Sequence, residues 1–247
     1  MVDIWREKVL IRFGSVDLSD RLTLWSIFNF FQEAAISHAA DLGVGREELL
    51  KKGQGWILSR LSLFVERRPL FGETVEISSW PRSWDKLFAL RDYEIRDTEN
   101  KVLVRGRGGW LVIDIEKRRP LRPQPIVETL PLNEGINAFP EGPAALDPRE
   151  KLAKNMTRTA LYSDIDNFGH ANNARYIQWI QDVTDMDVLT NADRIRLDIN
   201  YLSEVKPNET VEIWTASLEE PESGFAYEGR RPGSDQVVFR AELLTLK

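Results

Sequence analysis

One pentapeptide occurs twice in this 247-residue chain. Glu73–Ile77 reads Glu-Thr-Val-Glu-Ile, and the same five letters return 136 residues later at Glu209–Ile213. A second correspondence, at an offset of 149, places the run that ends at Gln32-Glu33 on the run that ends at Gln181-Asp182. The chain therefore reads as one fold written twice. This limits it to two similar halves, each of ordinary domain size.

The two halves differ at a few polar positions. At the offset of 149, Asp17 falls on Asp166, whereas Arg21 falls on His170. At the offset of 136, Arg68 falls on Glu204. One half has kept Asp, His and Glu where the other half carries arginines. This asymmetry indicates an active site in the second half.

The first half predicts one strand, one long helix and then four strands. A wide apolar stripe at helical spacing indicates a helix from Leu24 to Leu42, with Thr23 as its N-cap and Gly43 at the C′ position. Strand-like patterns cover residues 8–14, 56–66, 73–80, 86–96 and 102–116. Relative to the second half there is a surplus of thirteen residues around Gly45–Lys52. We expect a short extra helix there, which is either a lid or pocket wall or a plain surface insertion.

The second half repeats the same order after a proline-rich stretch. Residues 117–152 contain seven prolines, which exclude a continuous helix or a central strand. A helix is predicted from Asn173 to Leu189. Strands are predicted at 156–163, 194–204, 209–217, 224–231 and 236–246. We predict an α+β fold in which each half packs its helix on an antiparallel sheet, with domains at 1–118 and 153–247 and a linker at 119–152.

Composition excludes several kinds of site. The chain has no cysteine, which excludes disulfides, a thiolate nucleophile and a zinc–thiolate centre. Its only histidines are His38 and His170, too few for a histidine-rich metal site. A net charge of −6 argues against nucleic acid as the main partner. With no apolar run near the roughly 20 residues of a membrane span and no evident leader, we expect a soluble, cytoplasmic, metal-independent protein. His38, inside the first helix, is expected to be structural.

Ser163–Tyr176 is the stretch that carries chemistry. Capping explains part of it, because Asn172 or Asn173 can cap the following helix and Asp166 can complement its positive end. Capping does not explain Gly169-His170 immediately before two asparagines. A helix N-terminus disfavours an imidazolium, so a neutral His170 can act as a base or a hydrogen-bond partner. The exposed N–H groups of the same helix end can hold a developing oxyanion.

This stretch resembles the Asp-x-Asp-x-x-Gly-His-x-Asn-Asn-x-x-Tyr signature of hotdog-fold thioesterases. The whole chain is similar in length and layout to acyl-[acyl-carrier-protein] thioesterases of the bacterial double-hotdog type, which are related to the plant enzymes. The resemblance covers nearly all residues. It includes Asp20–Thr23, Trp56–Arg60 and Asp166–Asn173. It implies a tandem double hotdog in which the first half is non-catalytic and the second catalytic.

The resemblance also implies roles for particular residues. The catalytic groups of the family match Asp166, His170 and, on the following strand, Glu204. Asp166 would orient groups at the thioester, His170 would hydrogen-bond or shuttle a proton, and Glu204 would activate water. Backbone N–H groups at Asn172 and Asn173 would support the oxyanion. Plant members often have a cysteine where this chain has Val205, so without a thiol we expect direct attack by activated water or general-base help from Glu204. They also have an asparagine where this chain has Phe168, so the role of that asparagine is either reassigned or lost.

The implied reaction is hydrolysis of a fatty acyl thioester of acyl carrier protein to fatty acid and carrier, which ends chain elongation, with no cofactor. The first half would line the acyl pocket, although its candidate residues also suit an ordinary core; they are Ile27, Phe28, Phe31, Leu58 and Leu61. Acyl carrier protein is acidic, and a basic run at Lys117–Arg122 could dock it, joined by Arg67, Arg68, Arg82 and Lys86, unless that run is simply solvated surface.

Two other functions fit the same residues. An acyl-CoA thioesterase would use the same loop, and a non-catalytic acyl-binding hotdog would keep the pocket alone. A hotdog dehydratase is disfavoured, because the proline-rich histidine loop of those enzymes is absent. The sequence leaves the acyl chain length open. It also leaves open whether two chains form a homodimer, since two fused hotdogs already supply the pairing that single hotdogs obtain by dimerising.

Overall fold

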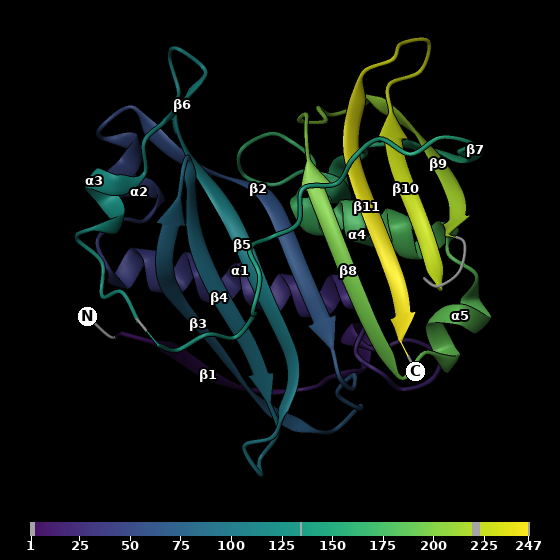
Figure 1. The fold of residues 1–247 in the computed structure, drawn as a ribbon, viewed down its shortest axis with the longest axis horizontal. Helices are drawn as coiled ribbons and strands as arrows, with labels where there is room; N and C mark the ends of the chain where they lie inside the picture. The colour runs from purple at the N-terminus through teal and green to yellow at the C-terminus, as the bar shows by residue number, and fades with distance from the viewer. Residues whose placement is uncertain (1–2, 134, 219–222, 247) are drawn as a thin grey trace. The chain divides into compact units, whose positions relative to one another are not determined.

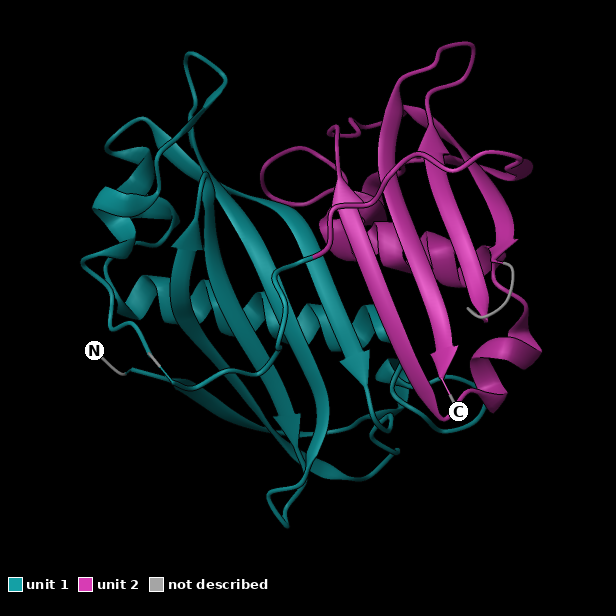
Figure 2. Cartoon of the chain, in the orientation of Figure 1, with its two compact units in different colours: residues 1–143 teal, residues 144–247 magenta. Residues whose placement is uncertain are grey.

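The computed structural model describes residues 3–133, 135–218 and 223–246. Within it the chain forms two compact units, residues 1–143 and residues 144–247 (Figure 2). Residues 119–143 of the proline-rich stretch belong to the first unit and residues 144–152 to the second. In the part of the chain described here, no helix is long and apolar enough to cross a membrane.

The first unit is an antiparallel sheet with one long helix across it. The sheet order is β1-β3-β4-β5-β2, and β6 pairs with β5. The strands are β1 Trp5–Leu10, β2 Gln54–Val65, β3 Thr74–Asp85, β4 Phe88–Arg96, β5 Val102–Asp114 and β6 Arg119–Leu121. The helices are the short turn η1 Phe13–Ser15, then α1 Leu24–Asp41, α2 Arg46–Leu50 and α3 Gln124–Val127. In Figure 1, α1 crosses one face of this sheet in purple.

Helix α1 begins and ends where its sequence predicts. The Thr23 side chain accepts a hydrogen bond from Ser26 N at 3.2 Å, and Gly43 adopts φ +69°, the left-handed conformation of a C′ residue. Its apolar stripe is buried against the sheet, where Phe31 stacks on Tyr93 of β4 with ring centroids 4.7 Å apart. The expected short helix after it is also present as α2. That helix buries Leu49, whereas a role as a lid stays a prediction.

The second unit repeats this plan with five strands in the order β8-β11-β10-β9-β7. The strands are β7 Ala153–Thr159, β8 Arg194–Tyr201, β9 Thr210–Leu218, β10 Gly224–Arg230 and β11 Val237–Leu246. The helices are the short turn η2 Tyr162–Asp164, then α4 Asn173–Val183 and α5 Met186–Asn191. Helix α4 lies on the sheet through Tyr176, whose ring meets Tyr201 and Phe239 edge-on at 5.4 and 5.6 Å.

Several boundaries in the second unit differ from the prediction, including that of the first strand, which was expected over 156–163 and is found at Ala153–Thr159. The helix expected over 173–189 ends at Val183, because Thr184 is extended (φ −80°, ψ 140°) and Asp185 caps a separate helix, α5. The Thr184 hydroxyl lies 2.7 Å from both Ile180 O and Tyr227 Oη, which holds the break. The strand expected over 194–204 ends at Tyr201. Glu204 therefore lies beyond the strand, in the loop that leads to β9.

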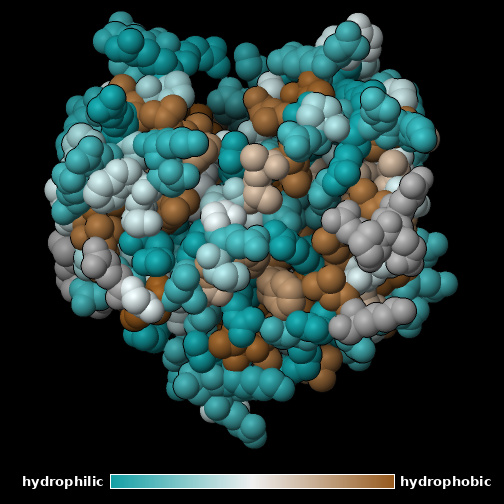
Figure 3. Space-filling view, viewed as in Figure 1, coloured by the Kyte–Doolittle hydropathy of each residue, from teal (hydrophilic) through white to brown (hydrophobic). Residues whose placement is uncertain are grey.

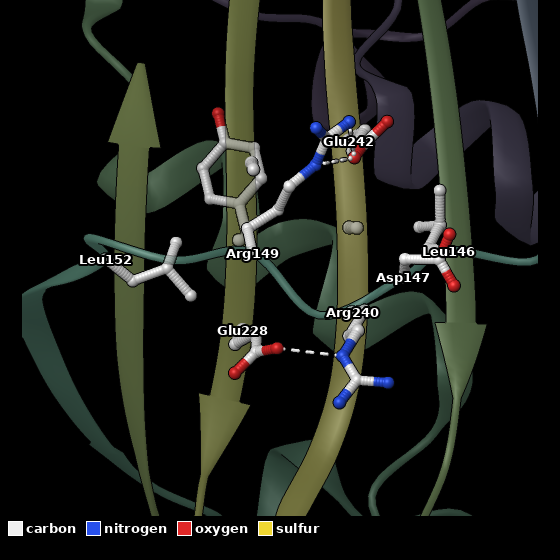
Figure 4. A pocket seen from close by; sticks show the side chains of 10 residues that line it. Leu146, Asp147, Arg149, Leu152, Glu228, Arg240 and Glu242 are labelled. Atoms are coloured by element: carbon white, nitrogen blue, oxygen red, sulfur yellow. Dashed lines mark hydrogen bonds and ion pairs between the residues drawn. The ribbon is translucent and has the colours of Figure 1, made fainter. Parts of the chain in front are cut away.

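The proline-rich stretch is tied to the sheet of each unit by polar contacts. In the first unit, Ala138 N donates to Asp92 Oδ2 at 3.0 Å, and Arg107 Nη1 donates to Glu141 O at 2.8 Å. In the second unit, Leu146 N donates to Asn200 Oδ1 at 2.9 Å. Arg149 also bonds Glu242 there, close to the pair formed by Arg240 and Glu228 (Figure 4). Over residues 119–133 and 135–152 the stretch therefore packs on the sheets while forming only the short strand β6 and the short helix α3.

Apolar residues reach the face drawn in Figure 3 only in small separate groups among hydrophilic ones. The large apolar side chains are mostly inside each unit. Trp80, Tyr93 and Phe31 are buried in the first unit, and Trp179, Tyr227 and Phe239 in the second. Each unit thus has its own core between its long helix and its sheet.

Candidate functional site

The predicted catalytic loop is a tight turn between β7 and α4. Asp166 N donates to His170 O at 2.9 Å, and Gly169 N donates back to Asp166 O at 3.0 Å. The Asp166 carboxylate closes the turn by accepting from Phe168 N at 2.8 Å. Gly169 has φ +81°, a left-handed conformation that favours glycine. The glycine before His170 is thus required by the turn, and the turn presents the histidine.

The start of α4 is capped by the first of the two asparagines. Asn172 Oδ1 accepts from Ala174 N at 2.9 Å, and Asn172 O accepts from Arg175 N at 2.8 Å. Asn173 is the first residue of the helix, and its carbonyl accepts from Tyr201 Oη at 3.1 Å. Two of the first N–H groups therefore already donate to Asn172. An oxyanion at this helix end has fewer donors to use than the sequence suggested, and this role stays a prediction.

His170 and Glu204 meet although 34 residues separate them. His170 Nε2 lies 3.2 Å from Glu204 Oε2, and the two side chains are 29% and 41% exposed, so both remain open to water. Their approach follows from the backbone, since Ala171 N donates to Val205 O at 2.8 Å and so joins the residues that follow each of them. A carboxylate in contact with an imidazole can transfer protons when both groups are accessible to water.

Asp166 stands apart from this pair. Its carboxylate accepts from the amide of Phe168, not from the His170 ring. Asp166 and Glu204 nevertheless both act on the buried Tyr176. Burial raises the pKa of that phenol well above its ordinary value and the two negative charges add to the rise, while the Val205 N–H and Arg231 oppose it. Of the three predicted catalytic residues, His170 and Glu204 are in direct contact, and the charges of Asp166 and Glu204 both act on the Tyr176 phenol.

The sequence did not point to Arg231, which lies just beyond β10. Its Nη1 bonds Glu209 Oε2 at 2.7 Å, and its Nη2 donates to Glu204 O at 2.7 Å. No motif marks this arginine, which falls on Ile95 at the offset of 136 and on Arg82, inside β3, at the offset of 149. Its contact with the Glu204 loop exists only because the turn after β10 reaches the loop after β8.

The first half closes the corresponding position with an ion pair. Arg68 Nη1 bonds Asp17 Oδ2, and Ser19 N donates to Asp17 Oδ1 at 2.9 Å. Arg68 is only 2% exposed. Burial on its own raises the pKa of Asp17, but the Ser19 hydrogen bonds and the Arg68 charge outweigh it, so this pKa lies below its ordinary value. The first copy thus has a fixed salt bridge where the second has a histidine and two carboxylates.

The five candidate acyl-pocket residues are core residues in the structure. Ile27, Phe28, Phe31, Leu58 and Leu61 are each no more than 2% exposed. Phe31 lies so close to Gly106 that a Cβ there would come within 2.7 Å of its ring. The small residues of β5 therefore make room for α1 side chains, and lining of an acyl pocket by this set stays a prediction.

The basic residues suggested for docking do not all lie together. β4 is antiparallel to both β3 and β5, so the β3–β4 turn with Lys86 lies at the same end of the sheet as Lys117–Arg122 after β5. β2 is antiparallel to β5 and ends at the opposite end of the sheet, where Arg67 and Arg68 follow it. Arg68 is also buried in its ion pair. The expectation that these two arginines join the basic run is therefore wrong.

His38 is fully buried, and its Nδ1 lies 3.1 Å from Arg91 Nη1. Because a guanidinium can only donate, Nδ1 must accept, and this ring is held neutral inside the first unit. That position suits the structural role expected from the sequence. Over residues 3–133, 135–218 and 223–246, no group of three or more acidic or histidine side chains is placed to hold a metal ion.

Comparison with known families matches both halves of the chain. The model of the acyl-ACP thioesterase N-terminal domain matches residues 3–128, and that of the C-terminal domain matches residues 149–242. An acyl-[acyl-carrier-protein] hydrolase of Cuphea viscosissima is 24% identical over 86% of this chain and 55% of its own length. A palmitoyl-acyl carrier protein thioesterase of Cuphea hookeriana is 26% identical over 86% of this chain and 54% of its own length. The chain spans about half the length of these chloroplastic relatives.

Solved structures confirm the fold. An acyl-ACP thioesterase from Bacteroides thetaiotaomicron superposes with a TM-score of 0.83 at 26% identity, covering 98% of this chain and 97% of that one. A 12:0-ACP thioesterase from Umbellularia californica superposes with a TM-score of 0.82 at 21% identity, covering 98% and 97%. The α+β tandem double hotdog expected from the sequence is thereby confirmed.

Proposed function

Because the chain belongs to the acyl-ACP thioesterase family, we propose that it hydrolyses fatty acyl thioesters of acyl carrier protein to fatty acid and carrier. The observation that carries this proposal is the contact of His170 Nε2 with Glu204 Oε2 at 3.2 Å beside the N-terminus of α4. It joins the two residues best suited to proton transfer in a chain without cysteine.

The proposed reaction is direct attack by water. Glu204 takes a proton from a water molecule while the oxygen of that water bonds to the thioester carbonyl carbon. The C=O π electrons move onto the carbonyl oxygen, which becomes the oxyanion. When the tetrahedral intermediate collapses, the C–S bond breaks and the leaving sulfur takes a proton. The Glu204–His170 contact offers a route for that proton from the carboxyl to the imidazole and on to the sulfur. Asp166 shapes the turn that presents His170, and N–H groups near Asn172 and Asn173 face the oxyanion.

The first half supplies binding in this proposal. We assign the acyl chain to the packed interface of α1 and its sheet, where Ile27, Phe28, Phe31, Leu58 and Leu61 would have to move apart to admit it. Lys117–Arg122, with Lys86 at the same end of the sheet, is the proposed contact for the acidic carrier. The assignment of residues 1–118 to binding and 153–247 to catalysis, and a cytoplasmic location, belong to the same proposal.

The test is release of fatty acid from acyl carrier protein thioesters, with kcat/KM measured beside the matching acyl-CoA. We expect the carrier thioester to be preferred, and His170→Ala and Asp166→Ala to abolish turnover while the protein stays folded. Arg21→Ala, at the position that corresponds to His170, is the matched control and should keep wild-type turnover. Near-wild-type hydrolysis by both second-half variants would refute the assignment. A higher kcat/KM on acyl-CoA would change the substrate, and acyl binding without release would make the chain a binding protein.

A further inference from the structure

We propose that Arg231 is a positioning residue, which holds the loop after β8 so that Glu204 meets His170. The inference rests on the proposed function, since it concerns the geometry of the same site. The Arg231 guanidinium bonds the loop that carries Glu204 and not the His170 ring. It acts through the backbone that carries Glu204.

The loop from Leu202 to Glu209 lies outside the strands, so its shape depends on other contacts. Arg231 Nη1 pairs with Glu209 Oε2 at 2.7 Å near the end of the loop. Its Nη2 donates to the carbonyl of Glu204 at 2.7 Å and lies 3.5 Å from Ser203 Oγ. Glu209 in turn accepts from Lys206 N at 2.8 Å. One guanidinium thus joins the beginning and the end of the loop.

Glu204 is held by its backbone from two sides. Its own carbonyl accepts from Arg231, and the next carbonyl, that of Val205, accepts from Ala171 N at 2.8 Å. The Glu204 side chain itself is 41% exposed. An exposed carboxylate on a mobile backbone would sample many positions, whereas one on a fixed backbone has few rotamers to lose on meeting His170.

Arg231 is itself anchored and electrostatically matched to this place. Its own N–H donates to Gln236 O at 3.0 Å, and its carbonyl accepts from Ser234 N at 3.2 Å, within the turn after β10. The hydrogen bond from Arg231 is the largest cause that lowers the pKa of Glu209. The same positive charge opposes the rise in the pKa of Tyr176 that Glu204 and Asp166 reinforce. Arg231 therefore places a cation among the carboxylates of the site.

The first copy contains the same loop with a different clamp. Glu73, the counterpart of Glu209, accepts from Leu70 N at 2.9 Å and pairs with both terminal nitrogens of Arg67 at 2.8 and 2.9 Å. Arg67 Nη1 lies 3.5 Å from Arg68 O, the counterpart of the Glu204 carbonyl. At the offset of 136, Ser203 stands where Arg67 would be. The second copy thus has a serine at this loop position and is clamped from the turn after β10 instead.

This substitution supplies a matched control inside one chain. Arg231→Gln removes the clamp of the catalytic loop, and Arg67→Gln removes the equivalent clamp of the non-catalytic loop. A merely structural role predicts that both variants lose similar thermal stability and keep their kcat. A positioning role predicts a loss of kcat in Arg231→Gln alone.

The experiment measures kcat and KM on one acyl carrier protein thioester, and Tm, for wild type, Arg231→Gln, Arg231→Lys and Arg67→Gln. We expect Arg231→Gln to lose about 10- to 100-fold in kcat with KM changed less than about threefold, because a misplacement near 1 Å has effects of that size. Arg231→Lys should recover part of the loss, since an ammonium can still bond one acceptor. Arg67→Gln should keep kcat within about twofold.

Two outcomes overturn the proposal: an unchanged kcat in Arg231→Gln, or an equal loss in Arg67→Gln. A crystal structure of Arg231→Gln gives a readout independent of activity, and a His170–Glu204 separation still near the 3.2 Å of the wild type would also overturn it. Absence of fatty acid release by the wild-type protein would instead refute the proposed function, whatever the separation in the variant.

Discussion

The loop between β1 and α1 and the loop between β7 and α4 follow the same backbone path. Asp17 N donates to Arg21 O at 2.9 Å, and Asp166 N donates to His170 O at the same distance. One further backbone hydrogen bond in each copy attaches the loop to the segment that follows β2 or β8. These bonds join Leu22 N to Pro69 O and Ala171 N to Val205 O, each 2.8 Å long.

What differs is the chemistry on that common frame. In the first copy Arg68 is 2% exposed and paired with Asp17, whereas Glu204 in the second copy is 41% exposed and touches His170. The first pair is a salt bridge with a buried guanidinium, and we infer that it stabilises the loop. The second pair is open and can exchange protons. Two substitutions on a duplicated scaffold therefore separate a structural site from a chemical one.

The largest expected effect tests the chemical copy. Glu204→Gln keeps the size of the side chain and a hydrogen bond to His170, but an amide cannot take a proton from water. We expect kcat for acyl carrier protein hydrolysis to fall about 10³-fold, within the usual range for a general base. Unchanged Tm would show that the fold is intact. Full activity of the folded variant would remove Glu204 from the mechanism.

Next in size is the stability of the structural copy. Asp17→Ala removes the partner of the buried Arg68 guanidinium, and loss of one partner of a buried pair typically costs about 3–5 kcal/mol. Asp166→Ala removes the matching carboxylate, which accepts one amide hydrogen bond and should cost about 1 kcal/mol. Urea unfolding of both variants measures the difference. Equal losses would contradict the contrast between the two copies.

The same ion pair predicts a dependence of stability on pH. The pKa of Asp17 is lowered in the folded chain, so its contribution to stability is fully present above the unfolded pKa and is lost as pH falls through the folded pKa. At neutral pH, Asp17→Asn should have a lower free energy of unfolding than wild type. This difference should shrink as the solution is acidified below about pH 4, because wild type then loses the same ion pair. Asp20→Asn, in the same loop, is the control. Parallel curves for wild type and Asp17→Asn at all pH values would contradict the linkage.

Much of this fold could be predicted because local patterns and tertiary structure agree in it. The apolar stripe and cap of α1, the alternating strands and the duplicated Glu-Thr-Val-Glu-Ile run all describe the observed elements. The offsets also place Asp17 against Asp166 and Arg68 against Glu204, which the backbone bonds of the two loops reproduce. The turn before α4 and the N-cap of α4 could therefore be predicted from Gly169-His170 and from Asn172.

The unpredicted features depend on contacts between distant segments. Helix α4 stops at Val183 because Thr184 bonds Tyr227, 43 residues away, and the local pattern carries no sign of it. Arg68 looked like a surface cation until its position beside Asp17 was known. Arg231, after β10, makes the contacts that Arg67, after β2, makes in the first copy. Alignment of the two halves at a fixed offset pairs Arg67 with Ser203 and therefore does not identify Arg231.

The smallest expected effect concerns the left-handed residue that both loops require. Gly169 has φ +81°, and Asp20, at the corresponding position, has φ +58°. A Cβ at Gly169 would meet nothing within 4 Å, so a substitution there is opposed by backbone conformation alone. The left-handed conformation is about 1 kcal/mol less favourable for alanine than for glycine, whereas aspartate adopts it more easily than alanine.

Gly169→Ala should therefore lower the free energy of unfolding by about 1 kcal/mol, and Gly169→Asp by less, since the first copy already uses aspartate at this position. Asp20→Gly, the reciprocal change, should raise stability or leave it unchanged. Urea unfolding ranks the three variants. Because Gly169 directly precedes His170, any loss of kcat in Gly169→Ala should exceed that in Gly169→Asp. A larger loss in Gly169→Asp than in Gly169→Ala would mean that the backbone of the turn rearranges to accommodate a side chain. The two loops would then not share the same backbone requirement at this position.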